Sequence, residues 1–142
     1  MMSKALTPQE LESVAALRVA IRRFLNATDE VTGAQGLTPR QYDLLALLHR
    51  PSAGTLSATD IATQLCLSRS ATTELLTRAA GAGLITRLSD SQDMRVKRLA
   101  ATAEGTRRFS RAAKQLRAER NQLLALLRTA AAFAAALSSV IS

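Results

Sequence analysis

The stretch that decides the fold runs from Ala58 to Gly83 and reads ATDIATQLCLSRSATTELLTRAAGAG. Its first ten residues predict a short helix, and the apolar residues of its inward face are Ile61, Leu65 and Leu67. Ser68 is a favoured cap for the start of a second helix, and the two glycines at the end of the stretch are typical helix stops. Two short helices joined by a tight turn predict a helix-turn-helix.

A β-hairpin is predicted directly after this motif. Two strand-like segments, LITRL and RVKRLAA, are separated by polar turn formers and occupy residues 84–88 and 95–101. Because side chains alternate along a strand, Arg95 and Lys97 share one face of the hairpin and Arg98 lies on the other. A helix-turn-helix followed by such a basic hairpin has the organisation of a winged helix-turn-helix.

Further helices are predicted on both sides of this lobe. Thr7 with Glu10 forms a capping-box pattern, and Thr38 followed by Pro39 marks another helix start. A short extended piece is expected at 55–57, and the long C-terminal helix is expected to bend near 128–129. The predicted fold class is mainly α with a small β-wing, in a single domain of residues 1–142. Its parts are a winged helix-turn-helix lobe at 38–101 and flanking dimerisation helices at 7–28 and 103–141.

Composition and charge narrow the class of partner. The chain has 142 residues, of which 47% are hydrophobic and 21% charged, as expected of one globular domain. Lys and Arg number 19 against 11 Asp and Glu, and a formal charge of +8 favours a polyanion, either nucleic acid or an anionic membrane surface. Aromatic residues make up only 3%, which disfavours the base-stacking surfaces of single-strand binders.

Several function classes are disfavoured by what the sequence lacks. The single cysteine, Cys66, permits neither an internal disulfide nor a thiolate zinc site, and we expect no metal and no cofactor. Nucleophile, zinc-protease and phosphate-loop motifs are missing, so we predict that the chain is not an enzyme. The N-terminus lacks the apolar region of a secretory signal, and the apolar run AAAFAAAL is too short to span a bilayer. We therefore expect a cytoplasmic protein with no membrane partner.

The start of the second short helix carries the side chains of a DNA reader. Short hydroxyls and arginine hydrogen-bond to phosphates and base edges, and they occur here at Ser68, Arg69, Ser70, Thr72 and Thr73. The second helix of a helix-turn-helix enters the major groove with its N-terminal residues, where its dipole also attracts phosphate. An ordinary capped helix start would show similar residues. The basic wing can reach an adjacent minor groove, whose negative potential holds arginine.

Three blocks of the chain resemble the MarR family of dimeric winged-helix transcription regulators. They are GLTPRQYDLLALL at 36–48, DIATQLCLSRSATTELLTRAAGAGLITR at 60–87 and DMRVKRLAATAEG at 93–105. The last block resembles the family signature Asp-x-Arg followed by Leu-Thr-x-x-Gly. Ala101 replaces the leucine of that signature, and Ala79 and Ala80 replace a usual Leu-Glu pair. These smaller residues suggest a looser junction between the reader helix and the wing.

The resemblance implies a role for each candidate residue. Ser68, Arg69, Ser70, Thr72 and Thr73 would face the major groove. Arg78 would lie near the DNA backbone, and Asp93 would hold Arg95, the wing arginine, beside Lys97 and Arg98. The resemblance also implies a homodimer that binds a pseudo-palindromic site on double-stranded DNA, and a repressor that a small aromatic or anionic effector releases. Independently of the resemblance, the broad apolar faces of both flanking helices predict a partner that covers them.

Sensing residues and alternative functions remain open. Arg22 and Arg23, together with Tyr42 and His49, are the candidates for meeting an anionic aromatic effector. The alternative interpretations are solvated arginines, a core-edge tyrosine and a histidine that caps helix carbonyls. Cys66 precedes the reader helix and could respond to oxidation, although its leucine neighbours predict a small buried residue. The alternatives are therefore a redox-responsive regulator and a winged-helix protein-interaction module.

Overall fold

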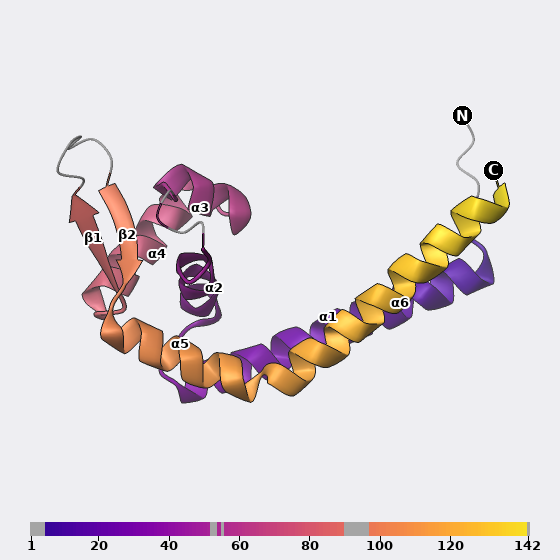
Figure 1. Cartoon of the computed structure of the whole chain (residues 1–142), viewed down its shortest axis with the longest axis horizontal. Coiled ribbons are helices and arrows are strands. Elements are labelled where there is room, and N and C mark those ends of the chain that lie inside the picture. Colours follow the sequence, from indigo (N-terminus) through magenta and orange to yellow (C-terminus); the bar gives the residue numbers. More distant parts are fainter. Residues whose placement is uncertain (1–4, 52–53, 55, 90–96, 142) are drawn as a thin grey trace. The chain divides into compact units, whose positions relative to one another are not determined.

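Helices and one small hairpin make up the fold. The computed structural model describes residues 5–51, 54, 56–89 and 97–141, and of residues 89, 97 and 132–141 it describes the backbone alone. Along this part of the chain the elements are α1 (Pro8–Ala34), α2 (Pro39–Leu48), α3 (Ala58–Gln64), α4 (Arg69–Gly81), β1 (Ile85–Ser89), β2 (Lys97–Ala101), α5 (Ala103–Gln115) and α6 (Arg117–Ile141) (Figure 1). The predicted fold class, mainly α with a small β-wing, is confirmed.

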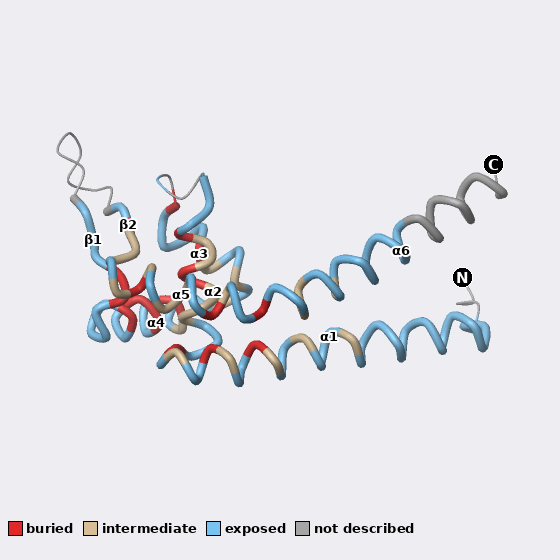
Figure 2. The backbone as a smooth tube through the Cα atoms, turned by 60° about the horizontal axis from the view of Figure 1, so that its bottom comes forward, coloured by how far each residue is buried: buried red, intermediate tan, exposed pale blue. Residues whose placement is uncertain are grey.

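The chain divides into two compact units, and each is described by itself. The winged unit comprises Asp29–Lys114, and the helical unit comprises Met1–Thr28 and Gln115–Ser142. The winged unit has a hydrophobic core where α2, α3, α4 and the base of the hairpin meet, and Figure 2 shows buried backbone in each of these elements. The buried core residues are Leu37, Leu44, Leu45, Leu48, Ile61, Leu75, Leu76, Ala79, Leu84, Ile85 and Leu99.

The helical unit keeps many apolar side chains in contact with solvent. Figure 2 shows α1 exposed over most of its length, and the described part of α6 is similar. Large apolar residues that remain 38–54% exposed are Leu11, Val14, Leu17, Val19, Ile21, Leu25, Leu124, Leu126 and Leu127. Surface helices of a monomer usually expose much less apolar surface than this.

Three helices end in the same way, with a residue of positive φ just after the last turn. Gly36 follows α1 with φ +69°, Cys66 follows α3 with φ +53°, and Gly83 follows α4 with φ +72°. The next amide then donates to a carbonyl five residues back, at 2.9–3.0 Å, in the pairs Leu37–Thr32, Leu67–Ala62 and Leu84–Ala79. This Schellman geometry satisfies carbonyls that a helix end otherwise leaves unpaired, and it sets the direction of the following chain.

The predicted helix starts are confirmed, whereas the predicted end of the first helix is wrong. Thr7, Thr38 and Ser68 each accept a backbone amide from three residues further on, at 3.2 Å. The first helix continues past residue 28 and through Gly33. A glycine inside a helix costs only about 1 kcal/mol relative to alanine, so it does not end one by itself. The helix ends at Ala34, and the backbone turns left-handed two residues later, at Gly36.

The extended piece expected at 55–57 is confirmed in part, because Ser57, which caps α3, has an extended backbone with φ −91° and ψ 168°, although Leu56 and Ser57 belong to no strand. One further prediction about secondary structure is wrong. The C-terminal helix is interrupted at Leu116, whose side chain is buried, and not near Arg128. The sequence changes from charged to Ala-rich at Arg128, but Arg, Leu and Ala all favour helix, so a change in polarity alone does not interrupt it.

Hydrogen bonds of Thr102 hold the base of the hairpin between α4 and α5. The amide of Thr102 donates to the carbonyl oxygen of Leu84 at 3.0 Å, and its hydroxyl donates to the carbonyl of Gly83 at 2.6 Å. The same hydroxyl accepts the amide of Gly105 at 3.0 Å and so caps α5. A Cβ at Gly105 would meet the carbonyl oxygen of Leu84 at 2.1 Å. The Thr-x-x-Gly run therefore fixes the base of the wing by close backbone contact.

Candidate nucleic-acid interface

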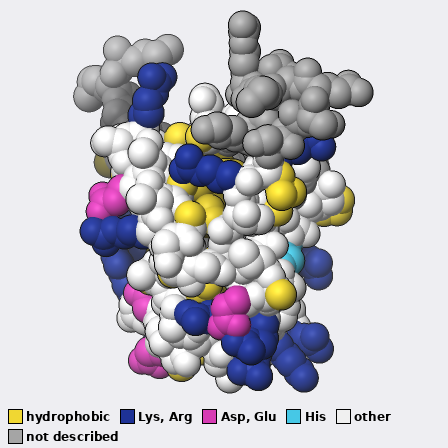
Figure 3. Space-filling model, turned by 90° about the vertical axis from the view of Figure 1, so that its left-hand side faces the viewer, with side chains coloured by type: hydrophobic (Ala, Val, Ile, Leu, Met, Phe, Trp, Pro, Cys, Tyr) yellow, Lys and Arg dark blue, Asp and Glu magenta, His cyan; other side chains and the backbone are white. Residues whose placement is uncertain are grey.

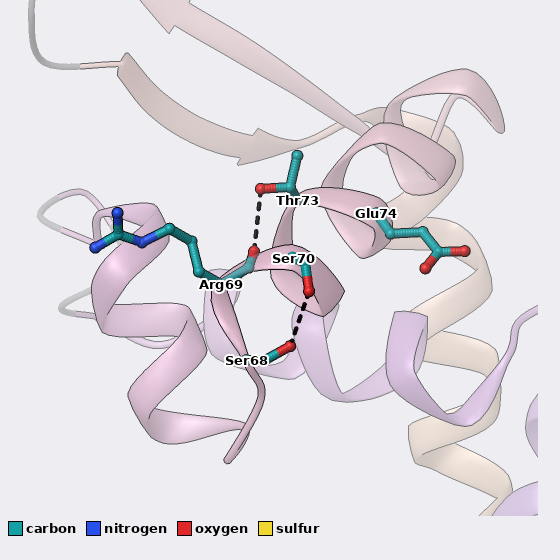
Figure 4. A pocket seen from close by; sticks show the side chains of 5 residues that line it. All are labelled: Ser68, Arg69, Ser70, Thr73 and Glu74. Atoms are coloured by element: carbon teal, nitrogen blue, oxygen red, sulfur yellow. Dashed lines mark hydrogen bonds between the residues drawn. The ribbon is translucent and has the colours of Figure 1, made fainter.

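The exposed face of α4 presents short polar side chains between arginines. At 3.6 residues per turn, the exposed polar side chains follow one another around the helix in the order Arg69, Thr73, Thr77, Ser70, Glu74 and Arg78. The opposite face packs into the core of the winged unit through Leu75, Leu76 and Ala79. Figure 4 shows Arg69 and Glu74 extending from different sides of the helix, with Ser68 and Ser70 at its start. The residues at the start of α4 are thus positioned by packing on its other side.

One residue that was predicted to face DNA is buried instead. Thr72 is only 3% exposed, and its hydroxyl donates to the carbonyl oxygen of Ser68 at 2.9 Å. The prediction that Thr72 faces the major groove is therefore wrong. Thr72 lies three and four residues before Leu75 and Leu76, which places it on the apolar stripe of the helix. Its methyl group suits that position, and its hydroxyl is satisfied locally by the helix.

The remaining residues at the start of α4 form a small polar surface. Ser68 Oγ lies 3.2 Å from Ser70 Oγ, and the Thr73 hydroxyl donates to the carbonyl oxygen of Arg69 at 3.1 Å. These four side chains and Glu74 line an open hollow on the surface (Figure 4). Hydroxyl oxygens retain lone pairs as acceptors, and a guanidinium supplies five N–H donors. The surface therefore offers groups of the kinds that contact phosphate oxygens and base edges.

Two residues of this face were missed in the sequence prediction, namely Glu74 and Thr77. Both are exposed, and each lies four residues after a predicted residue, Glu74 after Ser70 and Thr77 after Thr73, so helical spacing alone would have identified them. Glu74 Oε1 lies 2.6 Å from Nη2 of Arg78, one turn further on. The arginine that was expected near the DNA backbone is thus held in an ion pair along its own helix.

The wing adds positive charge beside this helix. In the antiparallel register Arg87 lies opposite Leu99, and Leu88 lies opposite Arg98. Leu99 is buried in the core, while both arginines and Leu88 are exposed. Arg87 was absent from the predicted site, although it lies on the strand that enters the wing. Figure 3 shows Lys and Arg side chains spread over this face of the chain, with Asp and Glu side chains beside some of them.

The outer part of the wing is described only in part. Lys97 pairs with Ser89 at the last position of the ladder, and of its side chain nothing is described. Asp93 and Arg95, the predicted carboxylate and wing arginine, lie outside the described residues. The cations of the wing that the structure does place are therefore Arg87 and Arg98.

Two arginines hold the helix-turn-helix from the side of α2. Nη1 of Arg40 donates to the carbonyl oxygen of Leu65 at 3.2 Å and lies 3.9 Å from Asp43. Burial raises the pKa of the Asp43 carboxyl, an effect that the charge of Arg40 partly offsets. Arg50 donates to the side-chain oxygen of Gln64. Both contacts reach the end of α3, so they help to fix the turn from which α4 begins.

A second ion-paired cluster lies at the start of α5. Glu104 accepts hydrogen bonds from Arg107 and, at 2.7 Å, from Nε of Arg108. These bonds, chiefly the one from Arg108, hold the pKa of Glu104 below its ordinary value. Arg108 also donates to the carbonyl oxygen of Gly36 at 3.1 Å. The start of α5 is thereby tied to the loop that leads into α2.

The predicted effector residues are divided between the two units. Tyr42 and His49 both pack on Phe109, with ring centroids 5.2 Å and 4.5 Å apart. The two ring nitrogens of His49 lie within hydrogen-bond distance of the Leu45 carbonyl and the Thr106 hydroxyl. The other two candidates belong to the helical unit, where the hollow of about 400 Å³ on α1 is lined by Arg18, Val19, Ile21, Arg22, Arg23 and Leu25.

Cys66 is exposed, and the expectation that it is buried is wrong. Its position is dictated by the turn, because it is the residue of positive φ that ends α3. Flanking leucines normally indicate burial, but a left-handed residue reverses the local direction of the chain. The thiol therefore lies at the surface. Cys66 is two residues before Ser68, the residue that caps α4.

Neither a metal cluster nor a membrane helix is found in the described part of the chain. Within those residues, no group of three or more His, Cys, Asp or Glu side chains is arranged to hold a metal ion. The described helices are likewise too short or too polar to cross a bilayer. The chemistry of the described site depends on hydroxyl, guanidinium and carboxylate groups.

Together, the α3–α4 pair and the hairpin after it define a winged helix-turn-helix protein. The model of the MarR family matches residues 37–97, which contain α2, the helix-turn-helix and β1. Over these residues the chain is similar to the MarR family, and the resemblance first drawn from its motifs is confirmed there.

Two relatives are similar over much of this region. The chain is 33% identical to the HTH-type transcriptional regulator FarR from Neisseria gonorrhoeae over 99 residues, which are 70% of this chain and 62% of FarR. It is 31% identical to the HTH-type transcriptional regulator PapX from Escherichia coli over 84 residues, 59% of this chain and 51% of PapX. The chain thus spans less than two thirds of either relative. Both are named as regulators, which agrees with the prediction that this chain is not an enzyme.

Solved structures share the fold. CouR from Rhodococcus jostii RHA1, bound to p-coumaroyl-CoA, is 27% identical with a TM-score of 0.65, over 75% of this chain and 74% of CouR. A MepR mutant from S. aureus bound to an oligodeoxyribonucleotide is 22% identical with a TM-score of 0.62, over 96% of this chain and 99% of MepR. AbsC from Streptomyces coelicolor, a MarR family transcriptional regulator, is 20% identical with a TM-score of 0.75, over 98% and 96%. At these identities, MepR and AbsC indicate a common fold alone.

Proposed function

We propose that this protein is a transcription regulator that binds double-stranded DNA with the exposed face of α4 and the wing. The observation that carries this proposal is the set of side chains on one face of α4, where Arg69, Ser70 and Thr73 are exposed while the opposite face is buried. The formal charge of +8 supplies attraction for phosphates. FarR and PapX are named as regulators, and a MepR mutant of the same fold is bound to an oligonucleotide.

In this proposal the protein acts as a homodimer on a pseudo-palindromic site. One reader helix gives weak discrimination, and two helices placed about 34–36 Å apart read successive major grooves on one face of the duplex. The exposed apolar face of α1 supplies a surface for the second copy, with Val14, Leu17 and Leu25 each at least 38% exposed. A stable dimer would remove this face from water.

We further propose a cytoplasmic repressor that a small aromatic or anionic effector releases from DNA. The bound p-coumaroyl-CoA of CouR, which is 27% identical, supports a ligand of this chemistry. In this chain the arginines of the α1 hollow, Arg22 and Arg23, offer charge for an anion beside apolar neighbours. Tyr42 and His49 are secondary candidates, since the ring nitrogens of His49 already face partners within the winged unit. A ligand releases DNA by preferring one arrangement of the reader helices over another.

Selection from a pool of random-sequence duplexes tests the DNA-binding proposal. We expect the full chain to enrich a two-fold-related sequence, and the logarithm of its affinity to fall steeply and linearly with the logarithm of salt concentration. Enrichment of no sequence, together with affinity that does not change with salt, would contradict it.

The effector proposal is tested by repeating the binding measurement with p-coumarate and with p-coumaroyl-CoA. We expect one of them to weaken binding of the selected duplex. The double variant Arg22→Ala with Arg23→Ala should lose that response, whereas Arg111→Ala, an exposed arginine of α5, should keep it. Unchanged response in the double variant would exclude these arginines from the effector site.

A further inference from the structure

Glu74 is an unexpected residue on a surface that otherwise suits a polyanion. It is the one acidic residue in α4, and its side chain is 60% exposed. It lines the same open hollow as Ser70 and Thr73, halfway along the exposed face of the helix (Figure 4). Phosphate groups repel a carboxylate, so at this position it lowers the attraction of the surface for DNA in general. It can favour binding only where it meets a hydrogen-bond donor.

An ion pair within α4 directs the carboxylate of Glu74 along the helix. Its Oε1 pairs with Nη2 of Arg78 at 2.6 Å, in the favourable order with the acid on the N-terminal side. An ionised carboxylate has four lone-pair positions on its two oxygens, so this pair leaves acceptor sites on the group. Apart from Arg69, the other side chains that line the hollow are the short ones of Ser68, Ser70 and Thr73, so a base edge can approach Glu74.

The major groove presents few donors to such an acceptor. They are the amino groups N4 of cytosine and N6 of adenine, and carboxylates characteristically accept from the cytosine amino group. We propose that Glu74 is a specificity-determining residue that accepts a hydrogen bond from the N4 amino group of cytosine within each half-site. This inference depends on the proposed function. Glu74 lowers affinity for sequences without an amino group at that position and retains it where cytosine is present.

The matched variant Glu74→Gln tests this inference, because it keeps size and shape while removing the charge. Random-duplex selection on wild type should show one position in each half-site where cytosine is preferred by at least about fivefold, the lower end of base discrimination by a good side-chain contact. Glu74→Gln should lose this preference and shift it toward adenine, which an amide pairs with in bidentate fashion. It should also bind unselected duplex more tightly, since a repelling charge is gone. Glu12→Gln, which removes one exposed charge from α1, should retain the cytosine preference.

A modified duplex locates the contact on the base. Replacing the preferred cytosine by 2-pyrimidinone removes the N4 amino group, which should weaken binding of wild type but not of Glu74→Gln. Identical base preferences in wild type and Glu74→Gln would overturn the inference and leave Glu74 as an intrahelical partner of Arg78. Absence of any selected sequence in wild type would instead refute the proposed DNA-binding function.

Discussion

Replacing Gly105 by alanine tests whether backbone contact at the base of the wing determines stability. Helix propensity alone predicts that alanine stabilises a helix by about 1 kcal/mol relative to glycine. The structure predicts the opposite sign at this position. The added Cβ would lie 2.1 Å from the carbonyl oxygen of Leu84, which already accepts the amide of Thr102. Because that oxygen belongs to the backbone, it cannot rotate away as a side chain would.

The expected magnitude follows from what must move. Relieving the contact requires α5 to separate from the entry to the wing, and overpacking of this kind costs about 1–3 kcal/mol. Loss of the Thr102–Leu84 hydrogen bond adds about 1 kcal/mol. Subtracting the gain in helix propensity leaves a net destabilisation of about 1–3 kcal/mol. For a chain of this size each kcal/mol lowers the melting temperature by about 3 °C.

Urea and thermal unfolding, followed by circular dichroism at one fixed protein concentration, measure this effect. The concentration is fixed because self-association would shift apparent stability by mass action. Gly33→Ala is the matched control, since Gly33 also lies in a helix and nothing lies within 4 Å of its added Cβ. That control should gain about 0.5–1 kcal/mol. If Gly105→Ala proves as stable as the control, the steric account of the junction is refuted.

Four further predictions address other parts of the molecule. Cys66→Gly should raise the free energy of unfolding by about 0.5–1 kcal/mol, because φ is +53° there; Cys66→Ser, which keeps that strain, should show no gain in urea unfolding. Arg69→Ala should weaken binding of the selected duplex and reduce its salt slope by about one, as fluorescence anisotropy at several salt concentrations would show. Leu17→Glu, at an exposed apolar position of α1, should give monomers in sedimentation while the far-ultraviolet spectrum stays unchanged. Glu104 has a lowered pKa, so its stabilising contribution is present above its ordinary pKa and is lost as the pH falls through the lowered value. Below about pH 4.5, the free energy of unfolding of wild type should therefore fall more steeply with falling pH than that of Glu104→Gln.

Local signals predicted the framework of the winged unit correctly. Thr38 and Ser68 are caps because short hydroxyls satisfy the first free amides of a helix, a requirement that depends on a few neighbouring residues alone. Gly83 ends α4 because a left-handed residue is needed there and glycine adopts it without steric cost. Such rules act over three to five residues, so a single sequence contains the information they need.

The errors arose where residue type and residue position point in different directions. Thr72 was assigned to the DNA face because hydroxyls suit DNA, yet residues 72, 75, 76 and 79 share the spacing of one buried helix face. Position decided its environment, since the methyl group of threonine tolerates a core. The same spacing places Glu74 and Thr77 on the exposed side. The acidic type of Glu74 did not suggest DNA contact, and Thr77 lies beyond the helix start to which the prediction was confined.

Cys66 and Gly105 show a different limit, because each depends on backbone geometry between segments. Nothing in LCLS indicates a left-handed residue, since cysteine rarely adopts positive φ and glycine or asparagine is the usual signal. Gly105 was recognised only as part of a motif, and its reason is a distance to Leu84 across 21 residues of chain. Sequence spacing therefore identifies which side chains share a helix face, whereas the closest backbone approaches have to be measured. The variants at these two positions are for that reason the most direct tests of the structure itself, independent of any partner.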